Sequence, residues 1–337
     1  MSTRLRLGYK ASAEQFAPRA LLDFAVLAEQ AGMDSVWISD HFQPWRHNGG
    51  HAPFSLAWLG ALGARTSRVL MGTSVLTPTF RYHPSIVAQA FGTLGALFPG
   101  RVALGIGTGE SLNEVPSSGV AWPEQKERTA RFKEAVELIR RLWCEERLSF
   151  HGQFYRTENA TIYDRPETPV PIYIAGAGPF MARFAGEHAQ GFICTSGKKW
   201  DLYSEILLPN VDAGLDKAGK PRDGIDRLIE MKVSFDSDRG RALEDTRFWG
   251  ALALTVEEKM NVEDPLQMER LADALPVERA ASRWIVSNDP QEIVERIRPY
   301  VELGFNHLVF HAPGPDQARF IELFGTWLGP LLRQTFA

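Results

Sequence analysis

The feature that most constrains the fold of this chain is a regular recurrence of short apolar runs, each followed by a longer amphipathic stretch. The first four runs begin near residues 5, 35, 69 and 102. Short apolar runs bounded by turn residues are typical of buried strands, and apolar residues three and four apart are typical of helices. The spacing suits one strand–helix–strand unit each, which predicts parallel strands joined by right-handed crossovers.

The rest of the chain completes a set of eight expected strands with helices between them. This pattern predicts an α/β fold, a (β/α)8 TIM barrel with insertions. A doubly wound sheet is the alternative, but it would leave two strands over. The expected strands are residues 5–9, 35–38, 69–74, 102–107, 171–175, 191–194, 230–235 and 307–311.

Two stretches interrupt the alternation. We expect a single barrel domain over residues 1–337, with insertions at about residues 109–170 and 236–282. The first contains a β-hairpin over residues 148–155, where a glycine marks the turn. The second shows helical patterns without a clear strand, and we expect it to lie over the mouth of the barrel.

Composition excludes several classes of function. An apolar content of 44% and a charged content of 23% are globular values, and a net charge of −4 gives no basic field for nucleic acid. Two cysteines are too few for a disulfide framework, and no cysteine–histidine spacing predicts a metal site. No apolar run approaches membrane-spanning length, and the N-terminus lacks an apolar signal core. We expect a cytoplasmic protein that binds neither nucleic acid nor membranes and has no metal site.

Polar residues and glycines gather where five of the expected strands end. Active sites of (β/α) barrels lie at the carboxyl ends of the strands, so we expect these residues to share one rim. They are Asp40, His41 and Trp45, then Ser74, Val75 and Thr77, then Thr108, Gly109, Glu110 and Asn113, then Gly176, Ala177 and Gly178, and finally Thr195, Ser196, Gly197 and Lys198.

An acid, a histidine and an indole leave the second strand together, at Asp40, His41 and Trp45. Histidine can take or give a proton near neutral pH. We expect Glu110, after the fourth strand, to project into the mouth beside His41, because a carboxyl group facing an imidazole provides for two proton steps. The alternatives are a capping aspartate beside a packed aromatic residue, and a solvated loop glutamate.

Residues 105–110, Gly-Ile-Gly-Thr-Gly-Glu, approach the dinucleotide-binding fingerprint but fail it. Glu110 stands where the last glycine is required, and we expect no helix to start directly after it. In the interpretation that we favour, the glycines let the backbone approach a flat ring.

Two further segments are typical of phosphate binding. Residues 176–179, Gly-Ala-Gly-Pro, precede a helix that contains Phe180 and Met181. The free N–H groups of such a helix start make a phosphate site, although an ordinary strand-to-helix turn has the same pattern. Residues 195–199, Thr-Ser-Gly-Lys-Lys, resemble a phosphate-gripping loop without being a Walker motif.

Lys259 and Arg283 lie in or next to the second insertion. Singly, each is typical of a surface charge. If the insertion covers the mouth, these two side chains and Lys198 would together hold a dianion.

The residues at these strand ends resemble a known family. The chain is similar to the actinobacterial F420-dependent glucose-6-phosphate dehydrogenases, within the luciferase-like superfamily of deazaflavin and flavin barrels. The resemblance runs nearly from end to end. The segments that carry it are residues 7–16, 39–47, 72–81, 194–198 and 307–314, of which residues 39–47 and 195–198 are the most specific.

The resemblance implies that coenzyme F420 binds in the mouth of the barrel. The deazaflavin would lie against a bulge where Ser74 and Val75 are joined by a cis peptide bond. Asp40, Thr77, Thr108, Gly109 and Asn113 would contact the cofactor, and Ala177, Gly178, Phe180 and Met181 would meet its phosphate-bearing tail.

The resemblance also implies a reaction and an assembly. His41 would take the proton of the sugar C1 hydroxyl as hydride leaves for the deazaflavin, Glu110 would handle the proton at the ring, and Trp45 would stabilise the arrangement. Thr195, Lys198, Lys259 and Arg283 would hold the sugar phosphate. The product would be a lactone and the protein a homodimer. An F420-dependent alcohol dehydrogenase, a flavin monooxygenase and a non-catalytic cofactor carrier are the alternatives.

Overall fold

The expected strands close into a parallel barrel. In the computed structural model, which describes residues 4–260 and 262–337, β9 (Asp226–Phe235) closes the ring by pairing with β8 (Gly191–Thr195) and β11 (His307–His311). This closure confirms the (β/α)8 barrel and excludes the doubly wound sheet, which stays open. The other barrel strands are β1 (Arg6–Ala11), β2 (Ser35–Ile38), β3 (Leu70–Thr73), β4 (Val102–Ile106) and β7 (Ile172–Ala175).

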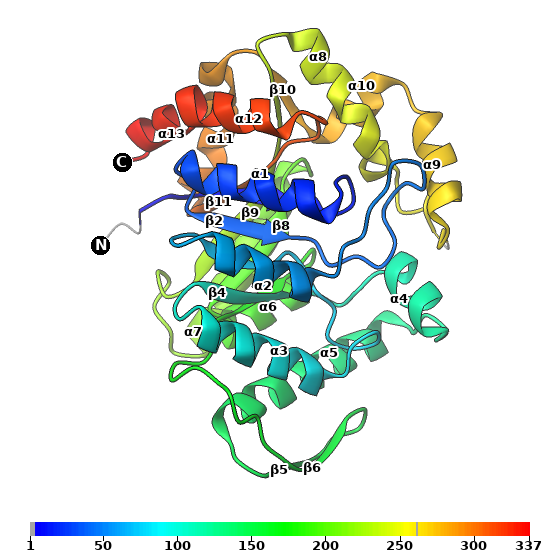
Figure 1. Cartoon of the computed structure of the whole chain (residues 1–337), viewed down its shortest axis with the longest axis vertical. Helices are drawn as coiled ribbons and strands as arrows, with labels where there is room; N and C mark the ends of the chain where they lie inside the picture. The colour runs from blue at the N-terminus through cyan, green and yellow to red at the C-terminus, as the bar shows by residue number, and fades with distance from the viewer. Residues whose placement is uncertain (1–3, 261) are drawn as a thin grey trace.

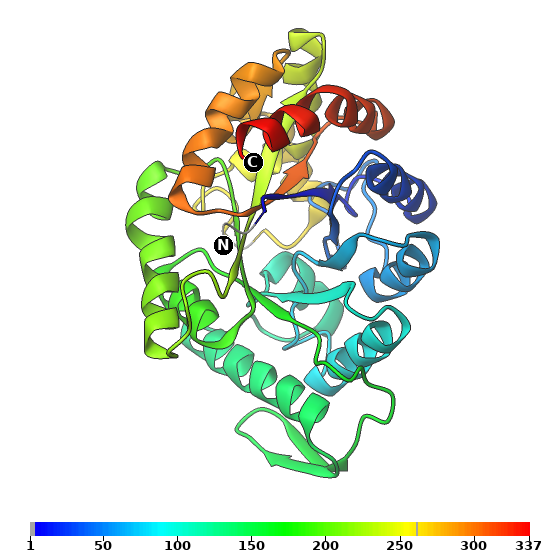
Figure 2. The ribbon, with the colours of Figure 1, turned by 90° about the vertical axis from the view of Figure 1, so that its left-hand side faces the viewer.

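Helices surround the barrel, as Figure 2 shows. The helix α1 (Pro18–Gln30) begins with a proline, whose fixed backbone angle suits a first turn, and it buries Leu21, Ala25 and Ala28. The other helices on the outside are α2 (Ser55–Arg65), α3 (Pro84–Leu97), α5 (Gln125–Cys144), α6 (Pro179–His188), α7 (Leu208–Lys217), α11 (Pro290–Leu303), α12 (Gln317–Leu323) and α13 (Gly329–Thr335), with π-helical turns at Leu202–Leu207 and Phe324–Leu328. Within the described residues, no helix is long and apolar enough to span a bilayer.

An apolar layer inside the barrel separates its two ends. Side chains alternate along a strand, so the positions two residues before and after this layer point into the same interior. On β9 and β11 these positions hold Asp226 and His307 at the amino end, and Glu230 and His311 at the carboxyl end. The layer itself consists of Trp37, Ala103, Tyr173, Ile193, Leu228 and Val309.

The first insertion differs from expectation in two places. A helix, α4 (Ser111–Ser118), starts directly after Glu110, so the expectation that no helix starts there was wrong. The segment has few apolar residues and contains Pro116, which hides the helical pattern. The hairpin consists of β5 (Leu148–His151) and β6 (Arg156–Ala160), so its second strand lies beyond the expected range. Because β6 is polar and largely exposed, it lacks the apolar alternation of a buried strand.

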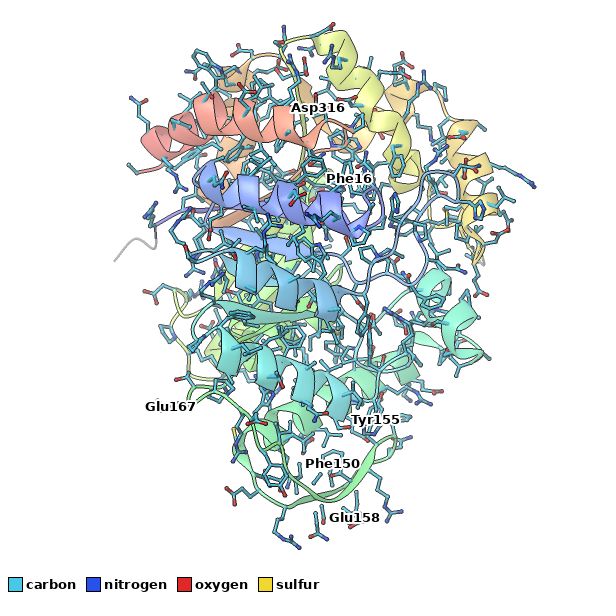
Figure 3. All side chains as sticks on the ribbon, viewed as in Figure 1. Phe16, Phe150, Tyr155, Glu158, Glu167 and Asp316 are labelled. Atoms are coloured by element: carbon cyan, nitrogen blue, oxygen red, sulfur yellow. The ribbon has the colours of Figure 1, made fainter. Side chains whose placement is uncertain are left out.

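The hairpin lies at one end of the molecule, away from the strands of the barrel (Figures 1 and 3). Tyr155, in the turn between its two strands, donates its hydroxyl hydrogen to the carbonyl of Thr79 at 2.8 Å. This bond connects the hairpin to the loop that follows β3. The hairpin therefore supports a loop of the barrel mouth from outside.

The second insertion lies beside the loop that follows β2, as expected. Arg46 of that loop bonds Glu269 at 3.0 Å and Asp273 at 2.8 Å, and Trp45 packs against the apolar cluster of the insertion. Sequence reasoning missed the short strand β10 (Ile285–Ser287), which pairs with the last residues of β9. The insertion contains α8 (Arg239–Glu244), α9 (Pro265–Asp273), α10 (Val277–Ala280) and 3-10 turns at Asp245–Ala253 and Ala281–Arg283.

Candidate active site

A cavity of about 370 Å³ opens at the carboxyl ends of the barrel strands. It lies at the side of the molecule where α4 and α9 are seen in Figure 1. The structure brings together most of the residues that the sequence placed on one rim. Those that line the cavity are Asp40, His41, Ser74, Val75, Thr77, Thr108, Gly109, Glu110, Asn113, Ala177 and Thr195.

A second cavity of about 850 Å³ adjoins the first and shares Thr108 and Ala177 with it. It contains the remaining residues expected at a cofactor tail, Gly178, Phe180 and Met181. Lys126 and Lys133 also line this cavity, so it is suited to an anionic group. The two cavities together form a trough that leads from the mouth to the start of α6.

His41 lies beside a buried carboxylate that sequence reasoning did not identify. Its Nε2 atom is 3.5 Å from Oε1 of Glu14, in the loop after β1, and Ser39 donates a hydrogen bond to the other oxygen of Glu14 at 2.8 Å. Glu110 lines the same cavity as His41. Its exposed carboxylate, however, is electrostatically coupled to Lys259. The carboxylate placed against the imidazole is therefore that of Glu14.

Asp40 is buried and fully engaged by the protein. Its two carboxylate oxygens accept from Ser55 at 2.5 Å, Tyr82 at 3.1 Å and Arg81 at 2.6 Å. Arg81 also pairs with Glu114, so a network of charges forms the floor of the cavity. Asp40 thus fixes the start of the loop that carries His41, besides lining the cavity.

Bare backbone forms one wall of the cavity. The peptide bond between Ser74 and Val75 is cis, as the resemblance implied. A Cβ atom on Gly107 would lie 2.9 Å from a methyl group of Val75, so only glycine fits between these segments. Asn113 accepts hydrogen bonds from the backbone N–H groups of Phe42 and Gln43 at 2.9 and 3.1 Å, which orders the loop after His41.

Trp45 connects the histidine to the expected phosphate site. Its ring centroid is 5.8 Å from that of His41, and the ammonium of Lys259 lies 5.3 Å from the indole ring. An ammonium over an indole face is a cation–π contact. Trp45 therefore stands between the titratable group and the cations.

The cations that the sequence could only suggest together do converge. Partial burial and the nearby charges of Arg283, Lys259 and Lys232 lower the pKa of Lys198 to about 8. Arg283 is fixed because its guanidinium donates to the carbonyls of Leu252 at 3.0 Å and Ser196 at 3.1 Å. Four positive side chains with so strong a mutual effect require an anion between them.

Known proteins share this arrangement. The luciferase-like monooxygenase family matches residues 1–307 of the chain. The F420-dependent glucose-6-phosphate dehydrogenase of Nakamurella multipartita is 65% identical over 329 residues, which cover 98% of this chain and 97% of the relative. The enzyme of the same name from Microbacterium testaceum is 61% identical over 337 residues, 100% of both chains.

The chain belongs to the F420-dependent glucose-6-phosphate dehydrogenases of the luciferase-like family. Among solved structures, an F420-dependent secondary alcohol dehydrogenase in complex with an F420-acetone adduct superimposes with a TM-score of 0.91. It is 32% identical and is matched over 98% of this chain and 99% of its own length. The barrel of this F420-dependent dehydrogenase family is therefore the one seen here.

Sequence reasoning about this F420-dependent dehydrogenase missed several charged residues at the mouth. The rule that function gathers at strand ends was applied to the second to sixth strands, and the same rule applied to the first strand would have found Glu14. Glu230 and Lys232 alternate with apolar residues within β9, which is unusual for an interior strand and is a detectable pattern. Arg81 carried no comparable pattern, because its role depends on the fold of its loop.

Proposed function

We propose that this chain is an F420-dependent glucose-6-phosphate dehydrogenase that oxidises the sugar at C1 to the lactone. The observation that carries the proposal is the convergence of Lys198, Lys259 and Arg283 beside the cavity that holds His41. A proton acceptor and a dianion site in one mouth suit a phosphorylated alcohol. The identity of close relatives with this name supports the same substrate.

The cavity fits the cofactor that the family uses. A flat ring needs bare backbone on one side, and Gly107 leaves no room there for a side chain. Asp40, Ser74, Val75, Thr77, Thr108, Gly109 and Asn113 would hold the ring, and Ala177, Gly178, Phe180 and Met181 the tail. Coenzyme F420, when bound, supplies a deazaflavin that accepts a hydride.

His41 would accept the proton of the C1 hydroxyl, because loss of a hydride requires the proton to leave as well. Glu14 lies 3.5 Å from the imidazole and would stabilise its charged form. Glu110, across the cavity, would handle the proton at the cofactor ring, and Trp45 would support the His41 ring from one side.

Thr195, Lys198, Lys259 and Arg283 would bind the phosphate of the sugar. A phosphate far from the reacting carbon supplies binding energy that positions C1 against the hydride acceptor. The cations also separate this proposal from an alcohol dehydrogenase of the kind that shares the fold, since an unphosphorylated alcohol gives them no partner.

The deciding experiment mixes the purified protein with oxidised F420 and glucose 6-phosphate, glucose or isopropanol, and follows the loss of the deazaflavin absorbance. We expect reduction with glucose 6-phosphate alone, and reduction with isopropanol alone would refute the proposal. Replacing the ammonium, as in Lys259→Met, should raise the KM for glucose 6-phosphate while the Kd of F420 changes little.

We further propose that the protein is a cytoplasmic homodimer, as the resemblance implies. Light scattering on the purified protein would measure the mass in solution. A mass of one chain would refute the dimer, whose single chain is 37.7 kDa.

A further inference from the structure

A buried group of charges lies directly beneath the phosphate end of the cavity, and the proposed reaction does not use it. Lys10 of β1, Glu230 and Lys232 of β9 and His311 of β11 point into the same part of the barrel interior. Their side chains are 5%, 14%, 4% and 2% exposed. Burying charges is costly unless they are paired, so this group needs an explanation.

Glu230 is the centre of the group. Lys232 donates to its Oε1 atom at 2.7 Å, and His311 approaches the same oxygen through Nδ1 at 3.2 Å. Lys10 lies 3.5 Å from the other oxygen. Burial alone would raise the pKa of Glu230, but Lys232, Lys10 and His311 hold it well below its ordinary value. Glu230 is therefore a carboxylate that fixes the position of two ammonium groups.

The two lysines differ in what else they bind. Lys10 donates to the backbone carbonyl of Ser74 at 2.5 Å, at the cofactor end of the cavity. Lys232 donates to the hydroxyl oxygen of Thr195, which lines the cavity at the phosphate end. The same carboxylate thus supports one lysine toward each end.

The hydrogen bond from Lys232 determines what Thr195 can do. An ammonium has donors and no acceptor, so the Thr195 oxygen must be the acceptor of this bond. The hydroxyl hydrogen of Thr195 is then left to donate in another direction, and the cavity is where the side chain is open. A hydroxyl constrained in this way is a donor for an anion.

We propose that Lys232 is a positioning residue for phosphate binding, which orients the Thr195 hydroxyl as a donor to the phosphoryl group and is itself held by Glu230. The proposal rests on the proposed function only in naming the sugar phosphate as the anion. Lys232 also lies close enough to Lys198 to contribute to lowering its pKa, which places its charge near the same anion.

A double-mutant cycle tests the proposal on the cofactor-free protein. The variants are Lys232→Met, Thr195→Val and the combination, and the measurement is the Kd of glucose 6-phosphate and of inorganic phosphate by calorimetry. Each single change should weaken binding about tenfold, as loss of a hydrogen bond to a charged group does. Because Lys232 acts through Thr195, the double variant should bind no more than about twofold worse than Lys232→Met alone.

Lys10→Met is the matched control, because it removes the other ammonium from the same carboxylate. Its effect on phosphate binding should multiply with that of Thr195→Val, with no coupling. If Lys232→Met does not fold, Lys232→Gln takes its place, since its amide still donates to Thr195 but has no charge. In that case, we expect a smaller loss than with Thr195→Val.

Two outcomes would overturn the proposal: losses that multiply in the Lys232 cycle, or equal coupling of Thr195 to Lys10 and Lys232. Failure of the proposed function appears differently. A wild-type protein that binds inorganic phosphate but prefers glucose 6-phosphate no more than glucose would refute the sugar phosphate as substrate, and the cycle with inorganic phosphate would still decide the role of Lys232. A wild-type protein that binds neither phosphate would overturn both.

Discussion

The two ends of the barrel carry a histidine and a carboxylate on the same two strands. Asp226 and Glu230 lie four residues apart on β9, and His307 and His311 lie four residues apart on β11. Each acid bonds the histidine at its own end, at 2.8 Å below and 3.2 Å above. The same pair thus occurs twice, on either side of the apolar layer.

At the amino end, every bonding position of the pair is filled. His307 bonds Asp226 through Nδ1 and Ser35 through Nε2, the latter at 2.7 Å. Asp226 also accepts from Tyr173 at 2.8 Å and Arg6 at 3.1 Å. A closed network of this kind fixes the geometry of the strands and leaves nothing to bind a ligand.

At the carboxyl end, the pair is left open. Nε2 of His311 is buried and has no hydrogen-bond partner among the described residues, and Glu230 borders the cavity. Trp249 and Trp284 pack edge-on against the His311 ring, at centroid distances of 4.5 and 4.9 Å. The comparison teaches that a buried polar pair is structural where it is closed and available for function where the cavity interrupts it. Changes at the two ends should therefore affect different properties.

The largest effect is expected from His41 at the open end. His41→Ala should lower kcat/KM for glucose 6-phosphate by about 10²- to 10⁴-fold, since it removes the general base. Binding of F420, followed by fluorescence, should persist. His307→Asn is the matched control from the closed end, because its kcat per folded molecule should stay close to that of the wild type. Comparable losses of kcat in the two variants would remove the distinction between the ends.

The next effect is on stability and comes from the closed end. Asp226→Asn should lower the free energy of unfolding by about 3 kcal/mol, because it breaks a buried charged network. Burial would raise the pKa of Asp226, but His307 and Arg6 hold it below 3.8. The stability it contributes is therefore present above pH 3.8 and is lost as the pH falls through the lowered pKa. Urea unfolding at pH 7 and at pH 3 should give a smaller difference at pH 3, and an unchanged difference would contradict the assignment.

The barrel and its rim could be predicted from the sequence because both follow from spacing. Strand-length apolar runs at regular intervals leave few other folds, and parallel strands bring their carboxyl ends together wherever the loops go. Hence Asp40, Ser74, Gly109 and Thr195 line one cavity as expected. The convergence of Lys259 and Arg283 could be suggested only by resemblance, since they belong to an insertion without such a rule.

The partners of each side chain could not be predicted. The carboxylate beside His41 is Glu14 because the loop after β1 turns inward, and spacing does not encode that turn. The helix α4 and the strand β6 were missed or misplaced because their residues are mostly polar and their stability comes from tertiary contacts. In general, strand positions follow from local patterns, whereas hydrogen-bond partners follow from the paths of the loops.

A smaller effect at the open end concerns pH. Because the pKa of Lys198 is about 8, its ammonium loses its charge as the pH rises through that value. The kcat/KM for glucose 6-phosphate should then fall by up to about tenfold per pH unit above pH 8. Lys259 contributes to this lowered pKa, so Lys259→Met should move the decline to higher pH. A decline that stays at the same pH in Lys259→Met would assign it to another group.

The smallest effect is expected from two serines at the ends of one strand. Ser35→Ala leaves Nε2 of His307 without a partner, the condition in which His311 already exists, and should cost about 1 kcal/mol of stability. Ser39 follows β2 four residues later and donates to Glu14, so Ser39→Ala should lower kcat a few-fold with little change in stability. Urea unfolding and steady-state kinetics on both variants measure the contrast. If Ser35→Ala lowered kcat and Ser39→Ala lowered stability, the division between a structural and a functional end would be wrong.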